Sequence, residues 1–374
     1  MGRGDPVLAD AVRDPAPPIP RDEPDLGMAA QSRRARAWLL GLGVLLAVSA
    51  GAGIALGGVA IPPGDVLRIL GHHLFAVPAQ ADWSAPRDAI VWDVRVPRVL
   101  LAALVGAGLS VCGVALQAMV RNMLADPYLL GINSGASSGA AALILFGVGS
   151  GLGAHALPLS AFLGALAASC LVFFVARSGG RVTSVRLLLA GVAVGYALYA
   201  LTSFLIFAAD SAEGSRSVMF WLLGSLALAA WSGPFAVLVV VVLATIAFLT
   251  IWSRHLDALS VGDETAHTLG VSPERVRIIF LVVVALCIGV LVAASGSIGF
   301  VGLVIPHVAR RLVGSAHVRV VPVAALLGAI LLIWADVLAR VAFAPEEIPI
   351  GIITSIIGAP FLLLLIRRLH ATSV

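Results

Sequence analysis

Long apolar stretches separated by isolated charged residues form the dominant pattern along the chain. A helix needs about 20 apolar residues to cross the ~30 Å core of a bilayer, so each uncharged stretch can be measured against that length. Two stretches are too long for one crossing. Residues 127–176 contain no Asp, Glu or Arg over 50 positions, and the glycines between 147 and 153 with Pro158 predict a break between two helices. The Ser- and Gly-rich run 295–299 predicts a second break, within 278–309.

With these breaks the pattern predicts ten membrane-spanning helices in an all-α, polytopic fold. An amphipathic piece is expected at 221–231, before the sixth span. Residues 1–30, which are rich in proline and lack apolar periodicity, predict a disordered cytoplasmic tail, and residues 31–374 form one transmembrane domain. The expected spans are 37–64, 99–120, two within 127–176, 187–209, 235–253, two within 278–309, 320–343 and 348–366.

Composition and charge narrow the class of protein. The chain is 60% hydrophobic and only 12% charged, whereas soluble domains carry roughly 25% charged residues, which excludes an ordinary soluble enzyme. All 24 basic residues are arginine. A Walker A loop requires a lysine, so any ATP used must be hydrolysed by another subunit. The net charge is only +4 and the arginines do not cluster into a basic stripe, so no nucleic-acid partner is expected.

The distribution of arginine predicts an orientation. Lys and Arg are retained in cytoplasmic loops, and an internal N-terminus places eighteen of the arginines inside. Both termini are then cytoplasmic, as an even number of spans requires. The six arginines expected outside are Arg68, Arg87, Arg95, Arg98, Arg216 and Arg340.

Charged residues at the ends of two spans are the first candidates for function. Arg95 and Arg98 surround Pro97, which is expected to start the second span. Two guanidinium groups three residues apart could hold an external carboxylate, or they could simply anchor the helix at the membrane surface. Asp336 and Arg340 are four residues apart within the ninth span, so they can pair on one helix face. Charged residues within a span are functional candidates by default, and a self-satisfied pair near the outer end is the alternative.

The polar loop 254–277 is a second candidate. Within it, Asp263 and Glu264 begin a predicted short helix, where acidic residues suit the helix dipole, and Gly270 is placed to end it. A short helix between glycines is suited to docking a partner, and a solvated connector is the alternative. The polar turn after the second span leads to Asn133 and Ser134, which fit either a tight turn or a wet path.

No metal or catalytic site is expected. Cys112, Cys170 and Cys287 lie in apolar runs without metal-ligand spacing and are interpreted as small hydrophobic residues. The histidines show no metal-ligand spacing beyond the doublet His72-His73. No nucleophile with an acid or base partner is recognisable, which argues against a membrane enzyme.

Together the motifs from about 95 to 368 resemble the FecCD-type permeases of ABC importers, which move iron(III)-siderophores, haem and vitamin B12 across the bacterial inner membrane. Six segments in order carry the resemblance: RVPRVLLAALVGAGLSVCGVALQ, RNMLADPYLLGINSGA, LLLAGVAVG, GDETAHTLGV, GSIGFVGLVIPHVARRLVG and EEIPIGIITSIIGAPFLLLLIRR. The chain departs from the family pattern at Met123, where proline is usual. The tail lies outside the resemblance.

The resemblance implies a ten-helix permease of the type II, vitamin B12 permease-like fold in the bacterial inner membrane. It implies a dimer with a second copy or a paralogue, two cytoplasmic ATPase subunits that hold ATP and Mg, and an extracytoplasmic substrate-binding protein. No cofactor is expected on this chain itself. Transport would proceed by alternating access, with an iron(III)-siderophore as the expected cargo and haem or cobalamin as alternatives.

The resemblance also assigns roles to particular residues. Residues expected to dock the binding protein are Arg95, Arg98 and Arg340. The helix expected to couple to the ATPase contains Gly262, Asp263, Glu264, Thr265, Ala266, Leu269 and Gly270. The expected pathway and gate residues are Gln117, Asn122, Leu124, Asn133 and Ser134. An ion-coupled secondary transporter is the competing hypothesis, although Asp336 is its only intramembrane acid that could relay protons.

Overall fold

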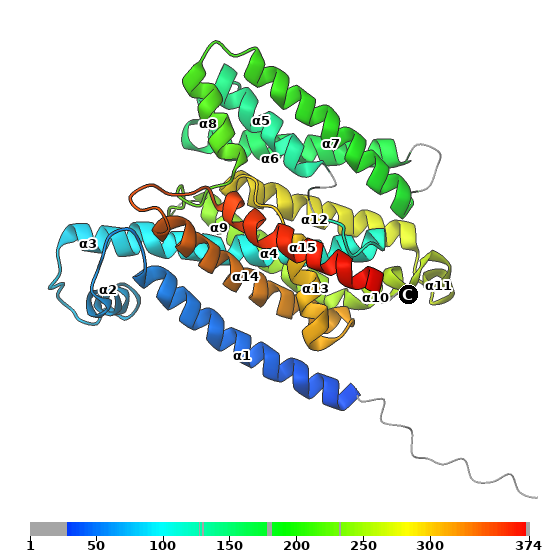
Figure 1. Ribbon diagram of the computed structural model, residues 1–374, viewed down its shortest axis with the longest axis horizontal. Coiled ribbons are helices and arrows are strands. Elements are labelled where there is room, and N and C mark those ends of the chain that lie inside the picture. The colour runs from blue at the N-terminus through cyan, green and yellow to red at the C-terminus, as the bar shows by residue number, and fades with distance from the viewer. Residues whose placement is uncertain (1–27, 127, 129–130, 178–181, 232, 372–374) are drawn as a thin grey trace, which may run out of the picture.

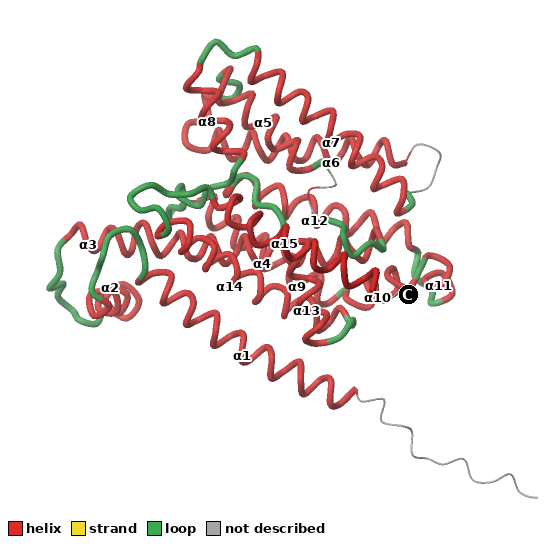
Figure 2. Tube along the Cα trace, viewed as in Figure 1, coloured by secondary structure: helices red, strands yellow, loops and turns green. Residues whose placement is uncertain are grey.

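The computed structural model describes residues 28–126, 128, 131–177, 182–231 and 233–371, and the regular elements within these ranges are all helical (Figure 2). In chain order they are α1 (Met28–Ala55), α2 (Pro63–Phe75), α3 (Ala85–Ala89), a π-helical segment (Ile90–Arg95), α4 (Val96–Val120), α5 (Ile132–Phe146), a 3-10 segment (Ser150–His155), α6 (Ala156–Arg177), α7 (Ser184–Phe207), α8 (Ala212–Leu222), α9 (Gly233–Ile251), α10 (Ser253–Val261), α11 (Asp263–Thr268), α12 (Pro273–Ser295), α13 (Val301–Val313), α14 (His317–Val341) and α15 (Ile350–Ala371).

The helices form a main body with a separate layer on one side (Figure 1). Helices α5, α6, α7 and α8 make up the layer, at the top of the view. Helix α12 joins the two parts, because it packs against α6 and α5 as well as against α4 and α9. Helix α1 lies along the opposite side of the body, against α14.

Each of the ten expected spans corresponds to a helix in the described part of the chain. Seven are long and apolar enough to cross a membrane: Gln31–Ala55, Ala85–Val120, Ala156–Arg177, Ser184–Phe207, Gly233–Ile251, Pro273–Ser295 and His317–Val341. The other three expected spans correspond to α5, α13 and α15. Both predicted breaks are confirmed, because α5 ends at Gly147 with φ 67° and α12 ends before Gly296 with φ 66°.

Helix α4 is the buried centre of the body, and glycines allow its neighbours to approach closely. Gly106 faces Gly328 of α14, and Gly113 faces Gly302 of α13. A Cβ atom added to Gly113 would lie 1.9 Å from the carbonyl oxygen of Gly302. Lipid offers no hydrophobic drive between helices, so small residues at such crossings supply the packing.

The first span is displaced from its prediction. It was expected at 37–64, but α1 covers Met28–Ala55 and α2 starts at Pro63. The prediction counted residues between charges, whereas the helix continues through Arg33, Arg34 and Arg36 because arginine is a good helix former. Gly57 and Gly58 follow its end. The predicted tail falls mainly on residues 1–27, which lie outside the described residues.

Pro97 lies in the first turn of α4, as the sequence predicts, but it does not begin the membrane-spanning helix. The helix is continuous from Ala85 to Val120, and Pro97 lies within it. The preceding segment Ile90–Arg95 is π-helical, and the N–H of Val96 donates to the carbonyl of Val91, five residues back. A proline ring clashes with the carbonyl four residues before it, so the wider π turn lets the helix continue.

The amphipathic helix before the sixth span is also misplaced in the prediction. It was expected at 221–231, but α8 covers Ala212–Leu222 and the residues that follow are not helical. Ser211 caps α8, since its side chain accepts from the N–H of Gly214 at 3.0 Å. The prediction followed the apolar residues and overlooked this cap.

Candidate functional site

Charged residues gather at the two ends of α4. We call them the Arg98 end, where α4 starts beside the C-terminal ends of α1 and α14, and the Arg277 end, where α4 stops beside α11 and the starts of α7 and α12. In Figure 1 the Arg98 end lies toward α2 and α3, and the Arg277 end toward α10 and α11.

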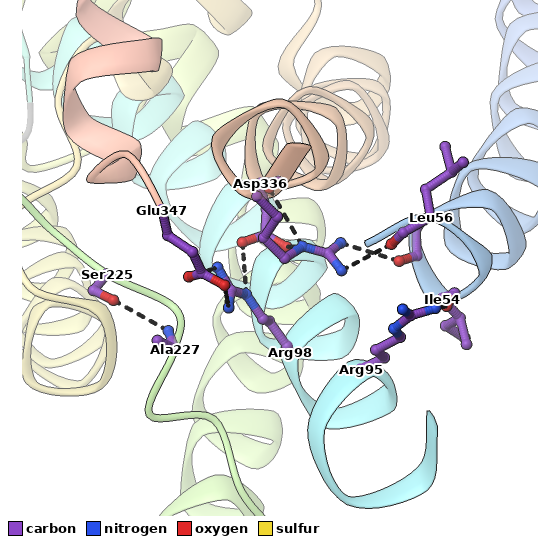
Figure 3. Close-up of polar contacts among 10 residues, drawn as sticks. Ile54, Leu56, Arg95, Arg98, Ser225, Ala227, Asp336 and Glu347 are labelled. Carbon is purple, nitrogen blue, oxygen red and sulfur yellow. Dashed lines mark hydrogen bonds and ion pairs between the residues drawn. The ribbon is translucent and has the colours of Figure 1, made fainter. Parts of the chain in front are cut away.

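At the Arg98 end two carboxylates bind Arg98. Its Nε donates to Asp336 Oδ1 at 2.9 Å, and its two terminal nitrogens bind the two oxygens of Glu347 at 3.0 and 2.9 Å (Figure 3). Asp336 also forms the predicted ion pair with Arg340, with its Oδ2 2.9 Å from Arg340 Nε. The Asp336 side chain is 1% exposed, whereas that of Glu347 is 44% exposed. Buried charges thus have partners, and only Glu347 reaches the surface.

The remaining arginine nitrogens cap the C-terminal end of α1. Arg340 donates to the carbonyls of Gly53 and Leu56, both at 3.0 Å. Arg95 donates to the carbonyls of Ile54 and Ala55 at 3.0 and 2.8 Å. The last carbonyls of a helix lack intrahelical partners and carry partial negative charge, so Arg95 and Arg340 anchor α1 to α4 and α14.

The three arginines predicted to dock a partner are therefore brought together, but they are buried. Their residue exposures are 4% for Arg95, 6% for Arg98 and 6% for Arg340. Their contacts within this chain join α1, α4 and α14 to one another, which differs from the membrane-surface anchor that was the alternative interpretation. The docking role stays a prediction.

A cavity of about 910 Å³ adjoins the Arg98 end. The residues that line it include Arg98, Asp336 and Glu347, together with Arg216 of α8. The segment after α8 completes the wall, with a turn in which Ser225 Oγ accepts from the N–H of Ala227 at 3.2 Å (Figure 3). This volume lies within the ~300–1,000 Å³ range of small-molecule pockets.

At the Arg277 end the predicted short helix is present as α11, six residues long. Asp263 begins it and binds Arg277, with Asp263 Oδ1 2.6 Å from Arg277 Nη2. This hydrogen bond lowers the pKa of Asp263 below its ordinary value, so the carboxylate is ionised near neutral pH. Gly262 and Gly270 enclose α11 with φ of 135° and 77°, a backbone region that favours glycine.

One face of α11 is buried and the other is exposed, as a docking element requires. Ala266 is fully buried, whereas Glu264, Thr265 and Leu269 are exposed. The surrounding loop 254–277 is largely helical, because it contains α10, α11 and the start of α12. A plain solvated connector would lack this regular structure. The coupling role of these residues stays a prediction.

Among the predicted gate residues, Gln117 is a buried tie between helices. Its Oε1 accepts from Arg310 of α13 at 2.5 Å, and its Nε2 donates to the carbonyl of Leu303 at 3.3 Å. Asn122 is exposed, and its Oδ1 accepts from the N–H of Leu124 at 2.9 Å. Asn122 and Leu124 thus form the tight turn that was the alternative interpretation.

Asn133 and Ser134 lie in the first turn of α5. The backbone carbonyls of both accept from serine hydroxyls one turn later. The Oδ1 atom of Asn133 is buried without a hydrogen-bond partner. The gating roles of all five residues stay predictions.

The sequence interpretation missed Asp126 and Tyr128, which lie between α4 and α5. Tyr128 Oη donates to the carbonyl of Ile298 at 2.7 Å and accepts from the N–H of Ile298 at 2.6 Å. It therefore holds the break between α12 and α13. Burial raises the pKa of Asp126 to about 6. The signal was their place beside Pro127 in an otherwise apolar region.

Glu347 and Arg277 were also missed as partners. Glu347 belongs to the acidic pair Glu346-Glu347 between two apolar spans, and Arg277 was counted only as an inner arginine. Their binding partners lie 249 and 14 positions away. Only the tertiary structure brings the Glu347 pair together.

The cysteines lie on apolar helices, as their interpretation as lipid- or helix-facing hydrophobic residues expects. Cys112 and Cys287 are buried and Cys170 is exposed, and all three are free. Within the described part of the chain, no three His, Cys, Asp or Glu side chains form a group that could hold a metal ion.

The fold and its charged ends define a multi-pass membrane protein with a buried central helix. In a comparison with known protein families, a model of the FecCD transport family matches residues 44–368 of this chain. The chain belongs to the FecCD transport family.

Individual relatives agree over most of the chain. The ABC transporter permease protein YvrB of Bacillus subtilis is 40% identical, over 91% of this chain and 96% of the relative. The cobalamin import system permease protein BtuC of Halobacterium salinarum is 40% identical, over 86% of each chain. The hemin transport system permease protein HmuU of Yersinia pestis is 40% identical, over 76% of this chain and 86% of the relative.

A solved structure supports the fold. A metal-chelate type ABC transporter in an inward-facing conformation superposes with a TM-score of 0.75 at 31% identity. The match covers 89% of this chain and 99% of that chain. The expected ABC importer permease fold is confirmed.

Proposed function

We propose that this chain is the membrane-spanning subunit of an ATP-driven importer of the class that carries iron chelates, haem or cobalamin. For this chain we propose an iron(III)-siderophore as the cargo. The relatives are named for cobalamin, hemin and ferric citrate import. Cargo would pass by alternating access between two permease subunits, a second copy of this chain or a paralogue. The ATP and Mg would be held by two separate cytoplasmic ATPase subunits.

The exposed helix α11, fixed to the membrane helices by a buried arginine, is the observation that carries the proposal. A chain without lysine cannot supply a Walker A lysine, so ATP would have to drive transport through contact with another protein. Helix α11 offers exposed residues for that contact, while Asp263 connects it to Arg277. A secondary carrier would have no use for such a contact.

Orientation in the bacterial inner membrane follows the arginine distribution. We place both termini and the Arg277 end in the cytoplasm, and the Arg98 end outside. The cavity beside Arg98 then opens toward the side from which a binding protein would deliver cargo. For docking we favour Arg98, since its terminal nitrogens bind a half-exposed carboxylate that an incoming acidic residue could replace.

Uptake into proteoliposomes tests the proposal. The permease is reconstituted with its ATPase and binding protein, and uptake is measured for iron-55 ferric hydroxamate, haem and cyanocobalamin. We expect uptake of one of these probes only with ATP inside and binding protein outside. Uptake that continues with a catalytically inactive ATPase, and stops when a proton ionophore is added, would instead identify an ion-coupled carrier.

A further inference from the structure

Arg277 uses its whole hydrogen-bonding capacity at the junction of four helices. A guanidinium group has five N–H donors in a planar fork. The Nε of Arg277 donates to the carbonyl of Met119 at 3.2 Å, and Nη1 and Nη2 each have two acceptors. The residue is 1% exposed. Five acceptors therefore match five donors, and water has no access to them.

The acceptors belong to separate elements. Met119 is in the last turn of α4, where carbonyls lack intrahelical partners. Val182 and Ser184 lie at the start of α7, at 3.3 Å from Nη1 and 3.1 Å from Nη2. Asp263 supplies both carboxylate oxygens from α11, at 2.6 and 3.2 Å. Arg277, which is part of α12, thus connects α11 directly to α4 and α7.

Few other features restrain α11 against the membrane helices. The chain enters it through Gly262 and leaves it through Gly270, both at positive φ. Ala266 is its one buried residue. Asp263 also lies 4.0 Å from Arg121, the residue that ends α4. The Asp263 carboxylate is therefore held by arginines from α12 and from the end of α4.

Movement of the last turn of α4 would also act on α13, because a residue half a helical turn away contacts that helix. Gln117 is two residues before Met119 and binds Arg310 of α13 at 2.5 Å. The hydroxyl of Ser184 also donates to the carbonyl of Met119, at 3.0 Å. A push on α11 therefore has a polar route to α7 and α4, and the last turn of α4 connects that route to Gln117 and α13.

We propose that Arg277 is the positioning residue that transmits displacement of α11 to α4 and α7, and so couples ATP hydrolysis in a partner subunit to opening of the transport path. This inference rests on the proposed function, and it names the side chain through which the coupling passes. Because Arg277 is 1% exposed, we expect it to act through the helices that it connects and not through contact with nucleotide or cargo. Its effect is on how much cargo moves for each ATP hydrolysed.

The test measures cargo and ATP together in the reconstituted complex, with iron-55 ferric hydroxamate, haem and cyanocobalamin as probes. We expect Arg277→Met to lower uptake per ATP about tenfold, within the range of coupling changes for residues between two sites, while hydrolysis stays within about twofold of wild type. Arg277→Lys should restore part of the ratio, because an ammonium group can keep Asp263 but has three donors instead of five. Arg275→Met, at an exposed position on the same helix, is the matched control and should retain the wild-type ratio.

A second variant keeps the test decisive if Arg277→Met does not fold. Asp263→Asn weakens the same link from the half-exposed side and should also lower uptake per ATP. A wild-type ratio in Asp263→Asn and in any folded Arg277→Met would overturn the inference, and so would equal losses of uptake and hydrolysis. A wild-type complex that takes up none of the three probes would instead overturn the proposed function on which the inference rests.

Discussion

The two ends of α4 use the same chemistry for different purposes. At the Arg98 end, buried arginines bind carboxylates and the last carbonyls of α1, and all partners belong to long helices or their connections. At the Arg277 end, one buried arginine binds carbonyls of long helices and a carboxylate on the six-residue helix α11. The first arrangement fixes helix to helix. The second fixes a surface element to helices, so its loss should affect transmission more than stability.

The largest effect is expected from removing the shared carboxylate at the Arg98 end. Asp336→Asn leaves Arg98 and Arg340 without their buried counter-charge, and breaking a buried pair costs about 3–5 kcal/mol. We expect a large fall in thermal stability of the detergent-solubilised protein. Asp93→Asn, at an exposed position near the same end, is the control. Equal melting curves for the two variants would show that the cluster does not hold α1, α4 and α14 together.

A smaller loss is expected midway along α4. Gly113→Ala places a methyl group against the carbonyl of Gly302, and overpacking of this kind costs about 1–3 kcal/mol. The added methyl group would push α4 and α13 apart, so uptake should also fall. Gly41→Ala on α1 has open space around its added methyl group and should leave both measurements unchanged. Normal stability and uptake in Gly113→Ala would mean that this crossing is loose.

Glu347→Gln should have a small effect on stability. Its carboxylate is half-exposed, and exposed ion pairs contribute only about 0.2–1 kcal/mol. The melting temperature should therefore fall much less than in Asp336→Asn, even though both carboxylates bind Arg98. Equal losses would remove the distinction between the buried and the surface partner of Arg98.

The smallest effect is expected from pH at the Arg277 end. The lowered pKa of Asp263 means that its ion pair contributes stability fully above the unfolded value of 3.8 and loses it as pH falls through the lower folded value. A spin label at Thr268 should keep the same mobility from pH 8 to about 5 and become more mobile only below about 4. In Asp263→Asn the label should be mobile at every pH. A mobility change between pH 8 and 5 in the wild type would contradict the assignment of this restraint to the Asp263 carboxylate.

The sequence predicts helices better than it predicts contacts between them. The helices that correspond to the ten expected spans, and both interruptions, were predictable because lipid requires long apolar segments and glycine marks the two breaks. Three local signals opposed simple counting and were misread: the arginines within α1, Pro97 within a continuous helix, and Ser211 before α8. The pair Asp336 and Arg340 was predictable because both residues lie on one helix face.

The partners of the remaining arginines were not predictable in this way. Arg98 binds Glu347 from 249 positions away, and Arg277 binds carbonyls at Met119 and Val182. Backbone acceptors leave no trace in a sequence. The burial of Arg95, Arg98 and Arg340 could likewise be seen only once α1 and α14 were packed against α4.

A distance measurement across the Arg277 end tests the central claim most directly. Spin labels at Thr268 of α11 and Val185 of α7, both exposed, are introduced after the three cysteines are replaced by alanine. The complex with its ATPase is measured in nanodiscs without nucleotide and with ATP bound. In the wild type we expect one narrow distance that is the same in both states, and in Arg277→Met a broad distance that changes with ATP. A distance in Arg277→Met as narrow and constant as in the wild type would contradict the role of Arg277.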